Sequence, residues 1–297
     1  MIVNGENLRT LGTAFKANFQ SGLGMHQSQW SQIATEVPST TARNEYGWLG
    51  QFPSMRRWLG DRVVNRASAH KYAIANDDYE LTVAVKRTHI EDDNIGIYRP
   101  LMEEMGRATA AHPDEDIFGL LAAGWDTECY DGQAFFDTDH PRLNAAGETV
   151  TVSNSGGGSG APWFLMDVSR ALKPLIYQTR KRPEFVSKDR PDDENVFMRK
   201  EFIYGVDCRD AVGFGFWQMA YGSQQELTAA NYKAARTALE GQLGDYDRPL
   251  GLQATLLVVP PSLEGAALEI LNAERNAAGA TNIWRGTAQM LKSPWIR

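Results

Sequence analysis

The feature that most limits how this chain can fold is a long stretch of apolar residues at helical spacing. These residues recur three and four positions apart, as one helix face requires: Tyr98, Leu101, Met102, Met105, Ala108 and Thr109. Acidic residues 91–93 and Asn94 are typical of a helix start, and Pro113 predicts a restart or kink. We therefore predict an interrupted helix of about 28 residues that is roughly 40 Å long and stops at Gly124.

The N-terminal part of the chain predicts an arm. Residues 8–19 form a short amphipathic helix pattern with one apolar side: Leu8, Leu11, Phe15 and Phe19. Residues 21–41 are rich in Ser, Gln, Thr and Gly and contain few large apolar side chains, which is typical of an extended linker. We expect such a segment to become ordered only by lying on something else.

Residues 69–88 predict a long two-stranded hairpin. Tyr72 and Ile74 precede the polar run 76–78, which is followed by apolar residues at every second position: Tyr79, Leu81, Val83 and Val85. The other side of the second strand is polar, with Glu80, Thr82 and Lys86. One face of this hairpin would therefore be exposed to solvent unless a neighbouring chain covered it.

The rest of the chain predicts strands followed by a helix, strand, helix unit. Residues 153–160 are rich in Ser and Gly and predict a mobile loop tip, and aromatic or β-branched runs between 163 and 221 predict a strand-rich region. Thr228 is the expected cap of a helix over 229–242. A strand at 255–259 and a helix capped by Ser262 complete the unit. The fold class is therefore α+β.

Composition and charge exclude several classes of protein. No apolar run approaches the roughly 20 residues needed to cross a bilayer, so we expect no membrane contact and a cytoplasmic product. The net charge of −7 disfavours a surface that grips nucleic acid throughout, and the basic cluster 180–182 is typical of a solvated loop or subunit contact. Cys129 and Cys208 lack the spacing of a zinc site or a disulfide framework.

No pattern in the sequence demands catalysis. The best candidate is a set of two carboxylates and an imidazole that would suit a metal-dependent hydrolase: Asp137, Asp139 and His140. A turn before Pro141 explains these residues without chemistry. The acids at 91–93 suit a helix start as well as magnesium, and the glycine-rich runs lack the endings of phosphate or dinucleotide loops. We expect no catalytic residue, no metal ligand and no cofactor.

The arm, the hairpin and the long helix share one property. The pattern alone predicts that none of them buries its apolar side within one monomer, and such elements are usually completed by other copies of the same chain. A homo-oligomeric assembly would explain all three features together. On this interpretation, deletion of residues 1–40 should leave a folded monomer that does not assemble.

Seven stretches, in order, resemble the Mu-like major head subunit family, gpT, whose members have the Hong Kong 97-type capsid fold. The resemblance covers nearly the whole chain and rests on residues 58–63, 90–98, 111–115, 129–133, 136–141, 173–176 and 257–261. It implies an α+β fold with an N-terminal arm, an extended E-loop hairpin, a long spine helix, and peripheral and axial domains. It also implies a structural capsid protein and not an enzyme.

The resemblance implies a division of the chain into five parts: an N-terminal arm at 1–45, the E-loop hairpin region at 46–93, a peripheral domain with spine helix and strands at 94–227, an axial domain at 228–285, and a C-terminal return segment at 286–297. It further implies self-assembly into the hexamers and pentamers of an icosahedral shell around double-stranded DNA.

The resemblance also sets the expected partners and location. They are other copies of the chain, scaffold and portal proteins, a decoration protein, and packaged DNA that is contacted weakly and non-specifically. The expected location is the virion capsid, assembled in the cytoplasm of a bacterial host. The nearest alternative is an encapsulin-like nanocompartment shell, and the alternative from another class is the metal-dependent hydrolase.

Overall fold

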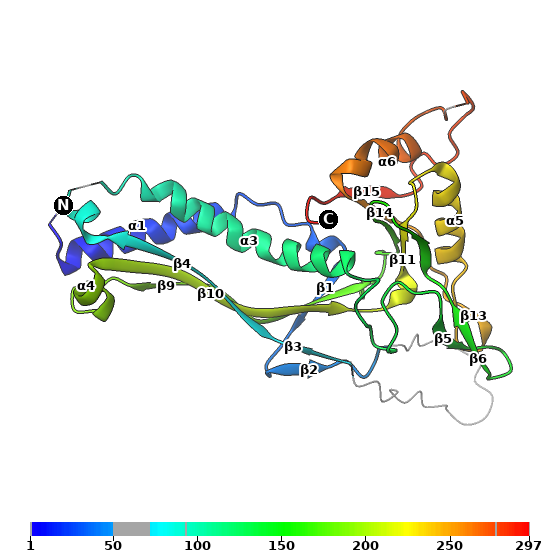
Figure 1. The fold of residues 1–297 in the computed structure, drawn as a ribbon, viewed down its shortest axis with the longest axis horizontal. Coiled ribbons are helices and arrows are strands. Elements are labelled where there is room, and N and C mark those ends of the chain that lie inside the picture. The colour runs from blue at the N-terminus through cyan, green and yellow to red at the C-terminus, as the bar shows by residue number, and fades with distance from the viewer. Residues whose placement is uncertain (1, 50–71, 93, 277, 297) are drawn as a thin grey trace.

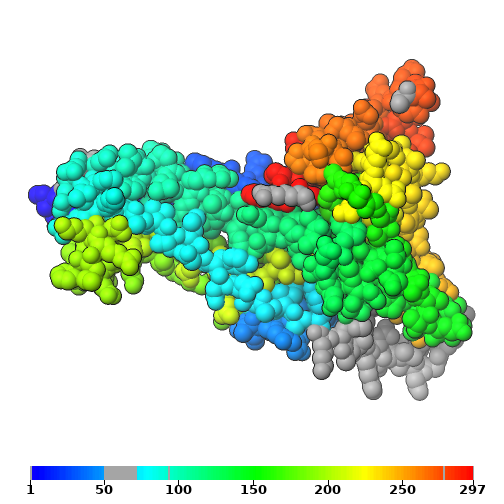
Figure 2. Space-filling view, viewed as in Figure 1, coloured from blue at the N-terminus to red at the C-terminus, as the bar shows by residue number. Residues whose placement is uncertain are grey.

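The computed structural model describes residues 2–49, 72–92, 94–276 and 278–296. The molecule is elongated (Figure 1), with a long extension of helices and strands at one end and a broader body at the other, which carries α5 (Ala229–Glu240) and α6 (Glu264–Leu271). Figure 2 shows the same outline in space-filling form. Among the described residues, no helix has both the length and the hydropathy to cross a membrane.

Helix α1 (Gly5–Leu23) lies in the extension. Asn4 caps it, because its side chain accepts a hydrogen bond from the N–H of Asn7 at 2.8 Å. The expected apolar side is confirmed, since four residues on one face are buried: Leu8, Leu11, Phe15 and Phe19. That face packs on α3 (Tyr98–Ala122) of the same chain and forms a separate hydrophobic core there.

The long helix predicted around residue 105 is α3, which spans Tyr98–Ala122 with Pro113 inside it. Its end before Gly124 agrees with the expected stop. Its start differs from the prediction, because Ile97 and not Asn94 is the cap residue, and its apolar side chain accepts no capping hydrogen bond. The acids at 91 and 92 instead end the short helix α2 (Arg87–Glu91), where Glu91 pairs with Arg87 at 2.8 Å.

A four-stranded sheet supports the two long helices. Its strand order is β1-β9-β10-β4, formed by β1 (Ala34–Pro38), β9 (Leu175–Lys188), β10 (Glu201–Phe214) and β4 (Asp77–Lys86). Strands β9 and β10 form a long antiparallel pair that is closed at its far end by α4 (Glu194–Arg199). This pair gives the extension its length.

The predicted hairpin at 69–88 is wrong. Strand β3 (Ala73–Ala75) pairs with β2 (Arg43–Glu45), while β4 pairs with β10 over its full length. Between them Asn76 makes no turn: its side chain donates to Ser39 Oγ at 3.0 Å and to Thr41 O at 2.8 Å, and it accepts from Gln178 Nε2. These bonds hold the chain in its passage from one sheet to the next. Period-two patterns identify strands but not their partners.

The linker at 21–41 is also ordered by its own chain. It contains the short 3-10 helix η1 (Trp30–Gln32) and strand β1, which pairs in parallel with residues 175–179 of β9. Ile33 is fully buried in the main core. The segment therefore does lie on another element, as expected, but that element belongs to its own chain and not to another copy. Residues 50–71, in the middle of the expected E-loop region, lie outside the described residues, as does the 58–63 stretch of the family resemblance.

The body is built on a second sheet with the order β15-β14-β8-β11-β7. Its strands are β15 (Gln289–Lys292), β14 (Leu256–Val259), β8 (Trp163–Met166), β11 (Ala220–Gln224) and β7 (Ser155–Gly158). The shorter elements of the body are β5 (His140–Leu143), β6 (Thr149–Val152), η2 (Trp217–Met219), β12 (Leu243–Gly244), η3 (Asp245–Asp247), β13 (Arg248–Pro249) and η4 (Pro261–Leu263). The sheet takes strands from both sides of residue 228.

Two strands and a helix of the body lie where the sequence predicts them. The strands at 163–166 and 256–259 and the helix capped by Thr228 are confirmed. Leu263 replaces Ser262 as the cap of α6. The predicted mobile tip at 153–160 instead contains strand β7. Asn154, just before that strand, is buried and donates to Phe135 O at 2.8 Å and to Trp217 O at 3.2 Å.

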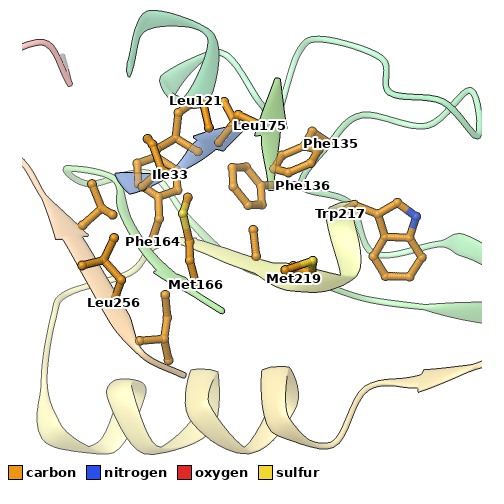
Figure 3. Packing of buried hydrophobic residues seen from close by; sticks show 14 of the residues in the cluster. Ile33, Leu121, Phe135, Phe136, Phe164, Met166, Leu175, Trp217, Met219 and Leu256 are labelled. Carbon is orange, nitrogen blue, oxygen red and sulfur yellow. The ribbon is translucent and has the colours of Figure 1, made fainter. Parts of the chain in front are cut away.

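The main hydrophobic core joins the body to the base of the extension. Figure 3 shows how side chains from distant segments meet in it, among them Ile33, Leu121, Phe164 and Leu256. Phe135 stacks on Phe214 with ring centroids 4.2 Å apart. Because the core draws on residues from 33 to 296, the chain forms one continuous structure with a smaller core under α1.

Candidate functional site

The three residues of the hydrolase hypothesis do not converge on one site. Asp137 accepts a hydrogen bond from the N–H of Thr138 at 2.6 Å, as expected of a turn, and Asp139 lies exposed beside it. The hydrogen bond and charge of Asp137 raise the pKa of Asp139. His140 turns the other way, into the core, where its ring stacks on Trp217 at 3.9 Å. The arrangement supports a turn and not a catalytic centre.

His140 belongs instead to a buried cluster that the sequence spacing did not reveal. Asp131 Oδ2 lies 2.8 Å from His140 Nδ1, and Asp131 Oδ1 accepts from the Cys129 thiol and the Gln133 N–H, each at 3.1 Å. Burial raises the pKa of Asp131, but the hydrogen bond and charge of His140 together with the other donors bring it below its usual value. One carboxylate thus fixes the loop between α3 and β5.

The same three side chains place their ligand atoms within 4.8 Å of one another, close enough to hold a metal ion. Two observations favour a hydrogen-bonded cluster over a metal centre. The separations of 2.8 and 3.1 Å are ordinary hydrogen-bond lengths, and burial strongly raises the pKa of the Cys129 thiol, which opposes the thiolate that a metal requires. We therefore interpret the cluster as a set of hydrogen bonds that holds this loop in place.

A second polar cluster joins the long helix to the four-stranded sheet. His112 of α3 lies 3.2 Å from Asp210 of β10, through Nε2 and Oδ1, and Asp210 Oδ2 accepts from the hydroxyl of Tyr177 on β9 at 2.9 Å. The ring of Tyr79 on β4 packs on His112 at 4.2 Å, and Asp116 lies 3.7 Å from the same imidazole. The helix is thereby tied to three strands at one point.

This joint predicts a pH dependence of stability. Burial disfavours the charged form of His112, yet the hydrogen bond to Asp210 and the charges of Asp116, Asp210 and Glu115 raise its pKa above 6.5. The stabilisation from His112 is therefore fully present below pH 6.5 and is lost as the pH rises through the folded-state pKa. We expect the difference in free energy of unfolding between the wild type and His112→Gln to shrink over that range. Urea titrations on both sides of pH 6.5 test this, and a constant difference would contradict it.

The basic cluster 180–182 lies on strand β9 and not in a loop. Lys181 pairs with Asp207 and lies 3.6 Å from Glu184, and Arg182 lies 3.4 Å from Glu36. Neighbouring carboxylates therefore offset much of its positive charge. Such a strand is poorly suited to hold phosphates tightly.

Large apolar side chains that are exposed to solvent could contact other copies of the chain. They occur along the extension and on the body, at Leu81, Ile97, Leu101, Leu172, Val186, Phe197, Met198, Tyr246, Leu268 and Ile283. Singly exposed apolar residues are common in soluble proteins. Their presence at both ends of an elongated molecule fits contacts with neighbours on several sides.

Comparison with known protein sequences identifies the family. The model of the Mu-like prophage major head subunit gpT matches residues 8–296. The major capsid protein of Escherichia phage Mu is 43% identical over 305 residues, which cover 100% of both proteins. The Mu-like prophage FluMu major head subunit of Haemophilus influenzae is 45% identical over 282 residues, which cover 93% of this chain and 92% of that protein.

Comparison with solved structures gives the same result. A chain of the procapsid of bacteriophage JBD30 matches with a TM-score of 0.87 at 48% identity and covers 99% of this chain and 100% of its own length. A chain of the JBD30 capsid matches with a TM-score of 0.78 at 35% identity over 100% of both chains. This chain therefore belongs to the Mu-like prophage major head subunit family, has the Hong Kong 97-type capsid fold, and is a major capsid protein of a tailed phage and not an enzyme.

Proposed function

We propose that copies of this chain assemble as hexamers and pentamers into an icosahedral shell that encloses double-stranded DNA. The observation that carries the proposal is the full-length likeness to a chain of the JBD30 procapsid, with a TM-score of 0.87. The elongated shape supports it, because a molecule with a long extension and a broad body can reach several neighbours at once. The net charge of −7 suits a container that releases DNA and does not coat it tightly.

The parts of the chain take the following roles in the proposal. Residues 1–45 are the N-terminal arm, 46–93 hold the E-loop, 94–227 form the peripheral domain with α3 as the spine helix, 228–285 form the axial domain, and 286–297 are the return segment. Because β7, β8 and β11 share one sheet with β14 and β15, we extend the axial domain to include them. The peripheral domain then keeps α3, β9 and β10, and its sheet is completed by β1 of the arm and β4 of the E-loop region.

The proposed partners follow the same pattern. One JBD30 capsid structure is described as decorated with minor capsid protein trimers, and we propose a decoration protein for this shell as well. Scaffold and portal proteins would direct its assembly in the bacterial cytoplasm, and DNA would be held weakly. An encapsulin-like compartment would differ in its contents, since it would hold protein cargo.

Co-expression of the chain with the scaffold gene from its own genome tests the proposal. We expect closed shells that sediment far faster than the 33.0 kDa monomer and that appear as icosahedra by electron microscopy. Particles isolated from phage-producing cells should contain DNA. If the chain sediments only as a monomer or small oligomer, the proposal is wrong, and particles filled with an enzyme would favour the compartment.

A further inference from the structure

Helix α3 lies along the four-stranded sheet (Figure 1), and at one point the two bring four possible metal ligands together. His112 and Asp116 are four residues apart on the helix, so they share one face. Cys208 and Asp210 are two residues apart on β10, so their side chains point to the same side of the sheet. The ligand atoms of His112, Cys208 and Asp210 lie within 4.8 Å of one another. The fold thus places two pairs of donor side chains face to face.

The distances within this group match those around a metal ion. Nε2 of His112 lies 3.2 Å from Asp210 Oδ1 and 3.7 Å from Asp116 Oδ2. Ligand atoms that lie about 2.0–2.3 Å from one tetrahedral zinc ion are roughly 3.3–3.7 Å apart. The Asp131 cluster differs, because its contacts of 2.8 and 3.1 Å are hydrogen bonds that use both oxygens of the carboxylate. An ion in that cluster would have to displace those hydrogen bonds.

The joint between α3 and β10 also carries more negative charge than its own chain neutralises. The side chain of Asp210 is 1% exposed and that of Asp116 is 23% exposed. Within residues 2–49, 72–92, 94–276 and 278–296, His112 is the one cationic side chain that forms an ion pair with either carboxylate. Burial raises the pKa of Asp116, and the charge of Asp210 adds to the shift. A divalent cation would match the charge of both carboxylates.

Two tyrosines already orient the possible ligands. The hydroxyl of Tyr177 donates to Asp210 Oδ2 at 2.9 Å, which leaves Oδ1 beside His112. The ring of Tyr79 packs on the imidazole of His112, with ring centroids 4.2 Å apart. Groups that hold the ligands from outside in this way are a regular feature of metal sites. The joint therefore has an outer layer as well as a set of donors.

We propose that the joint is a binding site for one divalent transition-metal ion, best matched by zinc, whose ligands are His112, Asp116, Cys208 and Asp210. Zinc binds imidazole nitrogen, thiolate sulfur and carboxylate oxygen. Burial and the charge of Asp210 raise the pKa of Cys208 to about 12, so the thiol releases its proton to solvent as the sulfur binds the ion. The two carboxylates supply the attraction that displaces this proton, whereas the single carboxylate of Asp131 is already satisfied by its own donors. The ion would fasten α3 to β10 within each copy, whether or not the copies form a shell.

Titration of the purified full-length chain with cobalt(II), after a chelator has removed any bound metal, tests the site. We expect one Co²⁺ per chain, with the visible absorption of tetrahedral cobalt and a thiolate-to-cobalt charge-transfer band, and Zn²⁺ should displace it. Cys208→Ser should abolish the charge-transfer band, whereas the matched control Cys129→Ser should keep it. Tyr177→Phe removes only the hydrogen bond to Asp210 and should weaken binding by about 10–100-fold. With chelator present the joint holds no ion, and the pH dependence expected for His112 is unchanged.

Asp116→Asn provides a second test that does not depend on the buried cysteine. The change keeps the size of a partly exposed side chain, so circular dichroism should show a folded chain that binds cobalt at least about tenfold more weakly. Absence of stoichiometric binding by the wild type, or binding without the charge-transfer band, would overturn the site. So would binding that Cys208→Ser and Asp116→Asn leave unchanged. A charge-transfer band that is lost in Cys129→Ser but kept in Cys208→Ser would place the ion at the Asp131 cluster and contradict the proposal.

Discussion

A chain that lacks residues 1–40 is expected to be insoluble or largely unfolded. The deletion removes α1, whose side chains Leu8, Leu11, Phe15 and Phe19 are buried against α3. Burial of each such side chain contributes about 1.5–3 kcal/mol, so their combined loss is comparable to the roughly 5–15 kcal/mol by which a typical domain is stable. The deletion also removes β1 from the edge of the sheet and Ile33 from the main core. Soluble yield and circular dichroism measure the effect.

This expectation replaces the one drawn from the sequence, in which the same truncation leaves a folded monomer that does not assemble. A matched pair of variants distinguishes these two expectations. Leu8→Asp with Phe15→Asp disrupts the buried side of α1 and should behave like the deletion, whereas Thr13→Asp with Lys16→Asp changes its exposed side and should remain folded. A soluble, cooperatively unfolding truncation would show that α1 belongs to another copy.

Replacement of Gly106 by alanine is expected to destabilise the chain by about 3 kcal/mol, at the upper end of overpacking effects. Helices α1 and α3 approach so closely here that a Cβ at Gly106 would lie 2.1 Å from the carbonyl oxygen of Phe19, and one at Gly22 would lie 1.9 Å from that of Glu103. Both obstacles are backbone atoms, which cannot rotate away. The helices must separate, and the core between them must open.

Gly119→Ala on the same helix is the control. A Cβ at Gly119 has no atom within 4 Å, so alanine there should stabilise α3 by up to about 1 kcal/mol through its higher helix propensity. Urea denaturation should therefore show changes in the free energy of unfolding that have opposite signs in the two variants. Equal effects would mean that the close approach of the two helices does not form in solution.

Local elements were predictable from the sequence where a periodic pattern and a cap coincide. The apolar face at residues 8–19, the helix after Thr228 and the buried strand at 163–166 all lie where the pattern placed them. In each case the signal is local, since spacing and a side-chain cap fix the element before any tertiary contact forms. Long-range pairing carries no such local signal.

The misassigned hairpin at 69–88 shows this limit. An alternating strand pairs with whichever strand tertiary packing brings beside it, and β4 meets residues 201–210, far along the chain. The mobile tip predicted at 153–160 failed for a similar reason, because its glycines are needed for close approach: a Cβ at Gly158 would lie 2.4 Å from the backbone of Gln224. Glycine-rich segments can be flexible or tightly packed.

The polar clusters were hidden from the sequence for the same reason. His140 was grouped with Asp137 and Asp139 because they are neighbours in the chain, yet it binds Asp131. His112 and Asp210 are 98 positions apart and meet only because α3 lies across β10. The turn chemistry at Asp137 was predictable, since a carboxylate that bonds the next N–H requires only local backbone.

The prediction that the arm, the hairpin and the long helix are completed by other copies of the chain was wrong for the first helix and the linker. The first helix and the linker are covered by their own chain. The apolar residues that do remain exposed include Phe197 and Met198 on α4 and Ile283 near α6. Exposed apolar residues that could contact other copies are therefore identified by burial in the folded chain and not by apolar pattern alone.

A cryo-electron microscopy map of the shells formed by this chain tests the account most directly. We predict a closed icosahedral shell in which α1 of each subunit lies on its own α3, while Phe197 and Met198 are buried against neighbouring subunits. A map without a closed shell would contradict the account. So would a map in which α1 packs on another subunit and Phe197 and Met198 of α4 remain exposed to solvent.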